Sequence, residues 1–173
     1  MIPCGQGQYT AGQNAVVFGS GTIGIAAAVA FKHFGMDRVM VCDRSDFRLK
    51  LAEKLGFAVC NPSAEDFGVK AAAYFGTAPS LSGSAANIDC WLDAAGAERI
   101  LEDFLRLGKI ESRFVSVAVN NKPRNIDLLH MTYAQQSIIG SGGYLPEDVQ
   151  DVQEIMSCGR WELEQIITHE FPL

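Results

Sequence analysis

Three glycines near the start of the chain could bring a peptide backbone against a phosphate group. Residues 19–24 read GSGTIG, which is Gly-x-Gly-x-x-Gly, and they come directly after the apolar run 14–18. An alanine-rich stretch follows, so the motif lies where a strand gives way to a helix. There Gly19 permits a tight turn, Gly21 admits a pyrophosphate and Gly24 lets the helix pack closely on the strand. The spacing predicts a phosphate-binding loop at a helix N-terminus.

A carboxylate at the right distance adds a second element. Asp43 follows the apolar run 38–42 and lies nineteen positions after Gly24. A carboxylate there can accept hydrogen bonds from an adenosine ribose, and it repels a phosphate on the 2′ oxygen. Asp43 could instead only cap the next helix, although Ser45 is better placed for that role. The motif and the carboxylate together predict that the chain binds NAD.

Other residues near these elements leave two interpretations open. Arg44 and Arg48 could bind ribose or phosphate, or be ordinary solvated side chains. Small residues at 93–96 and 117–119 follow two later apolar runs. Ligands of parallel sheets lie outside the carboxyl ends of the strands, so small residues there suit a bound cofactor. Small residues also pack well beneath any helix. This pattern alone therefore does not distinguish a cofactor site from ordinary packing.

The groups that hydride transfer needs are harder to find. Such an enzyme must polarise a carbonyl and move a proton. The histidines at 33, 130 and 169 have no cysteine nearby at a zinc-like spacing. The five cysteines form no CxxC pair, and their odd number is typical of reduced thiols in the cytoplasm. The residues predict no metal site and no catalytic group in this chain.

Alternating strands and helices must position the glycines and the carboxylate. The sequence predicts strands at 14–18, 38–42, 57–60, 88–92, 114–119 and 136–140. It predicts helices at 22–34, between Ser45 and Gly56, and at 64–75, 97–107, 126–133 and 146–158, with a loop at 76–86. This alternation predicts an α/β fold, a doubly wound parallel sheet of the Rossmann type with strand order 3-2-1-4-5-6.

Composition supports a folded domain and argues against two classes of partner. The 173 residues are 48% hydrophobic and 20% charged, with a net charge of −6. An acidic surface is a poor match for nucleic acid or an anionic membrane, so we expect neither partner. Residues 1–31 carry no charge, and the apolar stretch 14–31 is long enough to suggest a membrane helix. Its three glycines favour a buried strand, a turn and a buried helix instead.

Five segments, taken in order, resemble one family. They read VVFGSGTIGIAAA, VMVCDRSDFRLKLAEKLG, IDCWLDAAG, IDLLHMTYAQQSIIGSGGY and IITHEFPL. The set resembles the zinc-type medium-chain alcohol dehydrogenases, in particular the branch of polyol, butanediol and threonine dehydrogenases. The resemblance covers residues 13–173 and implies an NAD-binding Rossmann domain, with residues 1–12 as an N-terminal linker. In that family a GroES-like domain supplies the ligands of a catalytic zinc and the proton relay, and this chain is expected to lack it.

The resemblance also implies where the cofactor binds. The pyrophosphate is expected mainly at Thr22 and Ile23, the adenosine ribose at Asp43 and Arg48, and the adenine-side wall at Ala94. Backbone groups after the last two strands are expected to hold the nicotinamide amide. The full set of implied cofactor-binding residues is Gly19, Gly21, Thr22, Ile23, Gly24, Asp43, Arg48, Ala94, Val117, Ala118, Val119, Gly140 and Ser141.

The implied activity is oxidation of a secondary alcohol to a ketone, with hydride transfer to NAD. The chain alone is expected to be inactive, because zinc is expected only in the catalytic domain. A cysteine before the glycine loop is a zinc ligand in some members, but Cys4 lies too close to Gly19 to match. Two alternatives stay open: a regulatory module that binds a dinucleotide without catalysis, and a zinc-independent quinone-type reductase. The latter class usually uses NADPH, which Asp43 disfavours.

The last predicted strand suggests self-association. Strand 136–140 lies at a sheet edge in the predicted order, and residues 128–146 contain no Asp, Glu, Lys or Arg. Exposed edges are usually protected by charge, proline or a bulge. Members of the resembling family pair their cofactor domains edge to edge, so we expect a homodimer through 136–140 about a two-fold axis. The alternative is that helix 146–158 or the catalytic domain covers this edge.

Overall fold

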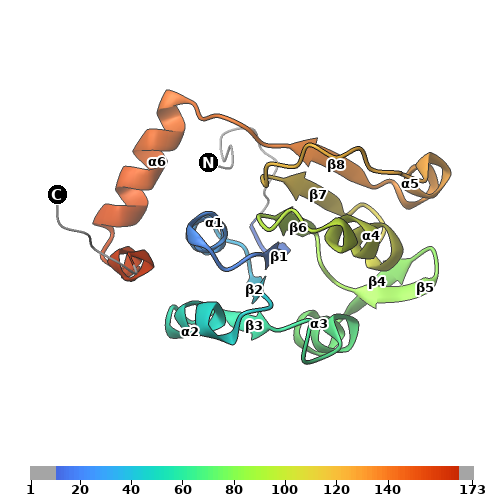
Figure 1. The fold of residues 1–173 in the computed structure, drawn as a ribbon, viewed down its shortest axis with the longest axis horizontal. Helices are drawn as coiled ribbons and strands as arrows, with labels where there is room; N and C mark the ends of the chain where they lie inside the picture. Colours follow the sequence, from blue (N-terminus) through green and yellow to red (C-terminus); the bar gives the residue numbers. More distant parts are fainter. Residues whose placement is uncertain (1–10, 168–173) are drawn as a thin grey trace.

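A six-stranded parallel sheet forms the centre of the molecule (Figure 1). The computed structural model describes residues 11–167. The sheet order is β3-β2-β1-β6-β7-β8, with every neighbouring pair parallel, which confirms the predicted topology. Its strands are β1 (Asn14–Phe18), β2 (Arg38–Cys42), β3 (Ala58–Cys60), β6 (Cys90–Asp93), β7 (Arg113–Ser116) and β8 (Ser137–Gly140).

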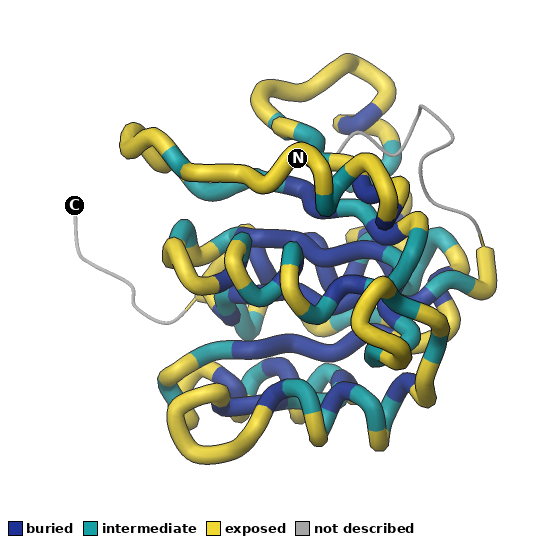
Figure 2. Tube along the Cα trace, turned by 90° about the vertical axis from the view of Figure 1, so that its right-hand side faces the viewer, coloured by how far each residue is buried: buried dark blue, intermediate teal, exposed yellow. Residues whose placement is uncertain are grey.

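The central strands are buried because helices cover both faces of the sheet. All five residues of β1 are buried, and Val17 lies between Val41 of β2 and Leu92 of β6. Strands that are buried on both faces consist of continuous runs of apolar residues. These strands could therefore be predicted from the sequence. Figure 2 shows these strands as the buried layer between more exposed helices. The apolar stretch 14–31 is thus a strand, a turn and a helix, as predicted.

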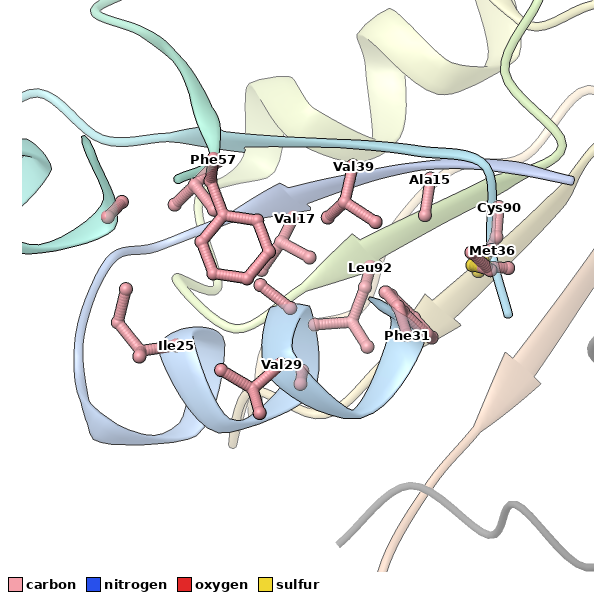
Figure 3. Packing of buried hydrophobic residues seen from close by; sticks show 14 of the residues in the cluster. Ala15, Val17, Ile25, Val29, Phe31, Met36, Val39, Phe57, Cys90 and Leu92 are labelled. Atoms are coloured by element: carbon pink, nitrogen blue, oxygen red, sulfur yellow. The ribbon is translucent and has the colours of Figure 1, made fainter. Parts of the chain in front are cut away.

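One face of the sheet is covered by α1 (Thr22–His33), α2 (Asp46–Lys54) and α6 (Pro146–Ser157). Ile25, Val29 and Phe31 of α1 pack on the side chains of the central strands (Figure 3). The short 3₁₀ helix η2 (Leu163–Ile166) follows α6 and packs against the same cluster. Burial of this apolar stripe holds α1, and with it the end of the glycine loop, in place.

The opposite face is covered by α3 (Phe67–Phe75) and α4 (Glu98–Leu107) around an aromatic cluster. Trp91 of β6 is fully buried there, and its ring centroid lies 5.3 Å from that of Phe67 and 5.8 Å from that of Phe104. Edge-to-face packing of this kind adds to the stabilisation from burial alone. The helix α5 (Leu128–Ala134) precedes the edge strand β8.

The prediction of a loop at residues 76–86 is wrong. These residues form an antiparallel hairpin of β4 (Thr77–Ser80) and β5 (Gly83–Ala86), separate from the main sheet. The two strands satisfy each other's backbone hydrogen bonds, and Ala86 packs against the aromatic cluster under α3 and α4. A composition rich in Ser, Gly, Ala and Pro hid this pairing, because the strands lack the β-branched residues that usually mark them.

The bounds of two predicted elements differ most from the structure, by three residues at one end. The helix predicted at 64–75 begins at Phe67, because the Asp66 side chain accepts a hydrogen bond from Val69 N at 2.9 Å and caps it. The strand predicted at 114–119 ends at Ser116, so residues 117–119 follow it as irregular chain. Among residues 11–167, no helix combines the length and apolar character that membrane crossing requires.

Several sequence features lie outside the described residues. They include Cys4, His169, most of the predicted linker 1–12 and the end of the motif IITHEFPL.

Candidate functional site

A cleft of about 1190 Å³ opens at the carboxyl ends of the strands. Its walls come from the residues that follow four neighbouring strands: Gly19 and Gly21 after β1, Asp43 after β2, Ser63 after β3 and Ala94 after β6. The chain leaves β1 for β2 on one side of the sheet and later returns to β6 on the other. Such a reversal of strand order is the place where open α/β sheets bind their ligands.

The glycine loop has the shape that the sequence predicted. Gly19 has φ +103°, a left-handed conformation that favours glycine, and a Cβ atom on it would lie 3.1 Å from Ala94 C. A Cβ atom on Gly24 would lie only 1.7 Å from Gly19 O, so α1 packs on the loop with no room for a side chain. A Cβ atom on Gly21 would have no described atom within 4 Å, which leaves open space where the backbone faces the cleft.

The first turn of α1 presents its N–H groups beside this open space. Gly21 is the N-cap residue, and no side chain caps the helix. Thr22 and Ile23 begin α1, and both are exposed. Uncapped N–H groups at a helix start, with the positive end of the helix dipole, form a ready site for an anion. The structure therefore brings the predicted pyrophosphate residues together at one end of the cleft.

Two backbone N–H groups orient the Asp43 carboxylate. Its Oδ2 accepts a hydrogen bond from Ser20 N at 2.7 Å, and its Oδ1 accepts one from Ser45 N at 2.9 Å. Each carboxylate oxygen has two lone pairs, so both oxygens retain acceptor capacity for ribose hydroxyl groups. Ser45, rather than Asp43, is the N-cap residue of α2, so the capping alternative for Asp43 does not hold.

Ser20 is a site residue that the sequence analysis missed. It is buried between the glycine loop and α2, and its Oγ donates a hydrogen bond to Arg48 O at 2.9 Å. The same residue therefore fixes both Asp43 and the first turn of α2 against the phosphate loop. The sequence offers one signal for Ser20, its position between the two glycines of the Gly-x-Gly motif. The motif sets no residue type at that position, so this signal is weak.

Both arginines near Asp43 line the cleft, and both are exposed. The Arg44 Nε donates a hydrogen bond to Ser63 Oγ at 3.2 Å, which directs that side chain across the cleft toward the chain after β3. Arg48 lies on the first turn of α2 beside Asp43. The structure brings both cations to the part of the cleft that Asp43 lines, and Arg48 is the one that the resemblance implies in ribose binding.

The wall after β6 is fixed by a buried carboxylate. Asp93 Oδ1 accepts hydrogen bonds from Ala95 N at 2.9 Å and Gly96 N at 2.7 Å. Burial raises the pKa of Asp93, while these two hydrogen bonds act in the opposite direction. Ala94 N donates to Phe18 O at 2.9 Å, and Ala94, which the resemblance places in the adenine-side wall, lines the cleft.

The residues implied in nicotinamide binding lie outside this cleft. Val117 N and Ala118 N both donate to Asp93 O at 3.0 Å, so these two N–H groups are already engaged. Val119 is fully exposed. Gly140 ends β8, and Ser141 N donates to Ser116 O at 2.9 Å. These five residues follow β7 and β8 at the same edge of the sheet, but they line no wall of the cleft near Asp43.

The described residues do not fit a zinc ion. Within the range 11–167, no three side chains of His, Cys, Asp or Glu come together in a way that could hold a metal. The His33 Nε2 lies 3.5 Å from a Glu154 carboxylate oxygen, at the end of α1 opposite to the glycine loop, and His33 does not line the cleft. His130 lies on α5, and its backbone N donates to the Asp127 side chain.

Comparison with known proteins places this architecture in a family. The family model described as zinc-binding dehydrogenase matches residues 22–157. An L-threonine 3-dehydrogenase of Bacillus velezensis is 26% identical over 165 residues, covering 94% of this chain and 46% of that protein. The (R,R)-butanediol dehydrogenase of Saccharomyces cerevisiae is 28% identical over 164 residues, covering 92% of this chain and 42% of that protein.

A solved structure has a similar fold. It is described as a short chain alcohol dehydrogenase (rspB) from Escherichia coli CFT073 complexed with cofactor NADH. It matches 96% of this chain and 47% of its own with a TM-score of 0.78 at 25% identity. The chain thus spans less than half of the length of these relatives. By the family match over most of its length and by its fold, the chain belongs to the zinc-binding dehydrogenase family.

Proposed function

We propose that this chain is the NAD-binding domain of a zinc-dependent dehydrogenase that oxidises a secondary alcohol, diol or polyol to a ketone. The observation that carries the proposal is the pair of hydrogen bonds that hold the Asp43 carboxylate beside the glycine loop. A carboxylate fixed there meets an adenosine ribose whose pyrophosphate lies on the N-terminus of α1. NADH in a related solved structure supports this assignment.

The residues of this chain bind and orient the cofactor in the proposed function. The N–H groups at the start of α1 hold the pyrophosphate, and Asp43 accepts hydrogen bonds from the ribose. The cleft between the chain after β3 and the turn after β6 takes the adenine ring, with Ala94 in its wall. Backbone carbonyl groups of residues 117–119 and the Gly140–Ser141 segment lie farther along the edge, on the side where the nicotinamide is expected. NAD itself supplies the acceptor for a hydride.

The proposal predicts a preference for NADH over NADPH. A 2′-phosphate would meet the Asp43 carboxylate and lose its ribose hydrogen bonds, at a cost of roughly 2–4 kcal/mol. Arg44 and Arg48 line the same edge and reduce this preference by offering the phosphate a cation. Isothermal titration of the protein with NADH and with NADPH measures the difference directly.

Two variants show whether Asp43 causes the preference. In Asp43→Ala, NADH should bind more weakly and the ratio between the two cofactors should shrink. Asp37→Ala is the matched control, because Asp37 precedes the other end of β2 and its exposed carboxylate lies 3.8 Å from the Nε of the neighbouring Arg38. Equal or tighter binding of NADPH by the unmutated protein would contradict the assignment and favour the quinone-type reductase.

We also propose a reducing compartment, the cytoplasm, as the place where the protein works. Cys42, Cys60 and Cys90 are buried and unpaired, and Cys158 is exposed and unpaired. Free thiols of this kind persist where glutathione and thioredoxin keep cysteines reduced. Fractionation of cells that produce the tagged protein tests this location.

A further inference from the structure

Two cysteines lie side by side beneath the candidate site. Cys42 is the last residue of β2, Cys60 is the last residue of β3, and they are register partners in the parallel pairing. Side chains of register partners point to the same face, and neighbouring strands lie about 4.8 Å apart. A disulfide requires Cα atoms roughly 4.4–6.8 Å apart. The Cα spacing of paired strands therefore falls within the range that a disulfide needs.

The side chains of the two cysteines share one environment. Both belong to the apolar cluster that α3 covers, together with Phe67 and Ala71. Each thiol is close enough to the other to shift its pKa. The two sulfur atoms are thus near each other in the reduced protein, on the side of the sheet that faces α3.

We propose that Cys42 and Cys60 form an oxidative modification site, at which a hydroperoxide converts the two thiols into a disulfide at the base of the cofactor cleft. Cys42 lines the cleft next to Asp43, and Cys60 lies directly behind it without exposed surface. Hydrogen peroxide therefore has to reach the pair through the wall of the cleft at Cys42. The part of the proposal that concerns cofactor occupancy rests on the proposed function.

The reaction proceeds in two steps. The Cys60 thiolate attacks one oxygen of hydrogen peroxide, the O–O bond breaks, and the departing hydroxide takes up a proton to leave as water. The Cys42 sulfur then loses its proton and attacks the resulting sulfenic sulfur, the S–O bond breaks, and a second water leaves. Two thiols lose two electrons in total, and one peroxide is reduced to two waters.

The environment favours Cys60 as the attacking sulfur. The neighbouring Cys42 thiol lowers the pKa of Cys60 and is the largest influence on it. Burial and the Glu65 carboxylate act against this shift, and the Lys70 ammonium acts with it. Burial raises the pKa of Cys42, which therefore stays a thiol and a hydrogen-bond donor until the second step. Thiolate character controls which sulfur is oxidised first.

The other described cysteines lack this arrangement and serve as internal controls. Cys90 is equally buried, but its register partners are Ala15 and Arg113, and burial raises its pKa to about 12. Cys158 is exposed at the end of α6, where its Sγ donates to Ile155 O. Neither has a register-paired cysteine beside it, so neither is expected to form an internal disulfide.

Peptide mapping of the oxidised protein tests the proposal. The reduced chain is treated with hydrogen peroxide, denatured, alkylated and digested with trypsin, which places Cys42 and Cys60 on separate peptides, 39–44 and 55–70. We expect these peptides to be joined and lighter by two hydrogen atoms, while Cys90 is recovered alkylated. Cys42→Ala and Cys60→Ala should each abolish the joined peptide, and Cys90→Ala should retain it.

Cofactor occupancy separates this proposal from the proposed function. With NADH at about ten times its Kd, roughly one cleft in eleven is empty, so the oxidation rate should fall about tenfold. If the joined peptide forms at the same rate with NADH, and calorimetry detects no binding, then the disulfide stands and the cofactor assignment fails. If peroxide leaves the two thiols intact, or oxidises them separately to sulfinic acids, the modification site is overturned whatever the cofactor does.

Discussion

At the scale of single residues, Gly21 and Gly24 share one loop but face different surroundings. A methyl group on Gly24 would lie 1.7 Å from Gly19 O, whereas one on Gly21 would meet open space. We expect Gly24→Ala to lower the free energy of unfolding by at least roughly 1–3 kcal/mol, because the helix must move off the strand. Gly21→Ala should change it by no more than about 1 kcal/mol, since its φ of −84° suits alanine.

The same pair separates folding from binding. Gly21→Ala places its methyl group where the pyrophosphate is proposed to lie, so NADH should bind more weakly to a protein that remains folded. Urea unfolding and calorimetry of both variants are the measurements. A Gly24→Ala variant as stable as the unmutated protein, or a Gly21→Ala variant with unchanged NADH affinity, would show that the loop is arranged differently.

A second residue-scale prediction concerns Asp93 and pH. Burial raises the pKa of this carboxyl, so the folded protein holds the proton more tightly than the unfolded chain does. The contribution of Asp93 to stability is therefore most favourable below its unfolded pKa near 4, and it declines as pH rises from there through the raised folded pKa. In Asp93→Asn the amide oxygen can keep both backbone hydrogen bonds, because both use Oδ1.

The measurement is urea unfolding across this pH window. The free energy of unfolding of Asp93→Asn, minus that of the unmutated protein, should become more positive as the pH rises. Asp37→Asn, which alters an exposed carboxyl, gives the baseline. A difference that stays constant, or that shrinks with rising pH, would mean that Asp93 is not destabilised by its burial.

At the scale of elements, the six strands of the main sheet could be predicted because burial on both faces leaves continuous apolar runs. Val16 and Val17 illustrate this, since both are fully buried. The hairpin at 77–86 could not be predicted, because Ser, Gly and Ala carry no such signal and the pairing depends on the neighbouring α3 and α4. The helix α3 begins three residues later than predicted, because the Asp66 side chain caps it at Phe67.

The edge strand β8 carries the element-scale prediction. It is last in the sheet order, and α6 lies on the α1 side of the molecule rather than over β8 (Figure 1). Leu128, Leu129 and Tyr133 of the preceding α5 are exposed. We propose that a second copy of the chain covers this edge, with β8 antiparallel to its equivalent across a two-fold axis.

Light scattering at micromolar concentration tests the association. Ile139→Lys should shift the protein from dimer to monomer by placing a charge in the junction. Ile138 packs against the aromatic cluster, so Ile138→Lys should weaken the fold as well as the dimer. Leu81→Lys, an exposed apolar residue at the tip of the β4–β5 hairpin, is the matched control. A monomer that neither isoleucine substitution alters would rule out this interface.

At the scale of the whole molecule, half of the candidate site could be predicted from spacing alone. The glycine motif and Asp43 depend on local turns that the sequence specifies, and the structure brings them into one cleft with Ala94. The roles of Ser20 and Asp93 depend on hydrogen bonds between segments that only the folded chain brings together. The sequence likewise could not show that two backbone N–H groups of residues 117–119 donate hydrogen bonds to Asp93 O.

The whole-molecule prediction concerns activity. We expect the 173-residue chain to bind NADH but not to oxidise butanediol, sorbitol or threonine, and to retain no stoichiometric zinc after purification without a metal-binding tag. The described residues offer no group that could hold a metal, and the chain spans less than half of its relatives. A cofactor-binding fold confers no activity without the catalytic residues. Alcohol oxidation by the chain, or one tightly held zinc per chain, would contradict this expectation.

The hydrogen bonds of Ser20 limit how far the site should change its conformation when a ligand binds. Ser20 joins the glycine loop to Asp43 and to α2 through contacts within the protein, so the part of the site proposed to meet the adenosine half of a ligand is held in place without that ligand. A ligand then finds its partners pre-organised and loses little affinity to their ordering. The empty and occupied forms of this half should superpose closely, with the backbone moving by less than about 1 Å. A larger movement on binding is expected outside the glycine loop, at segments that do not line the cleft, such as those after β7 and β8.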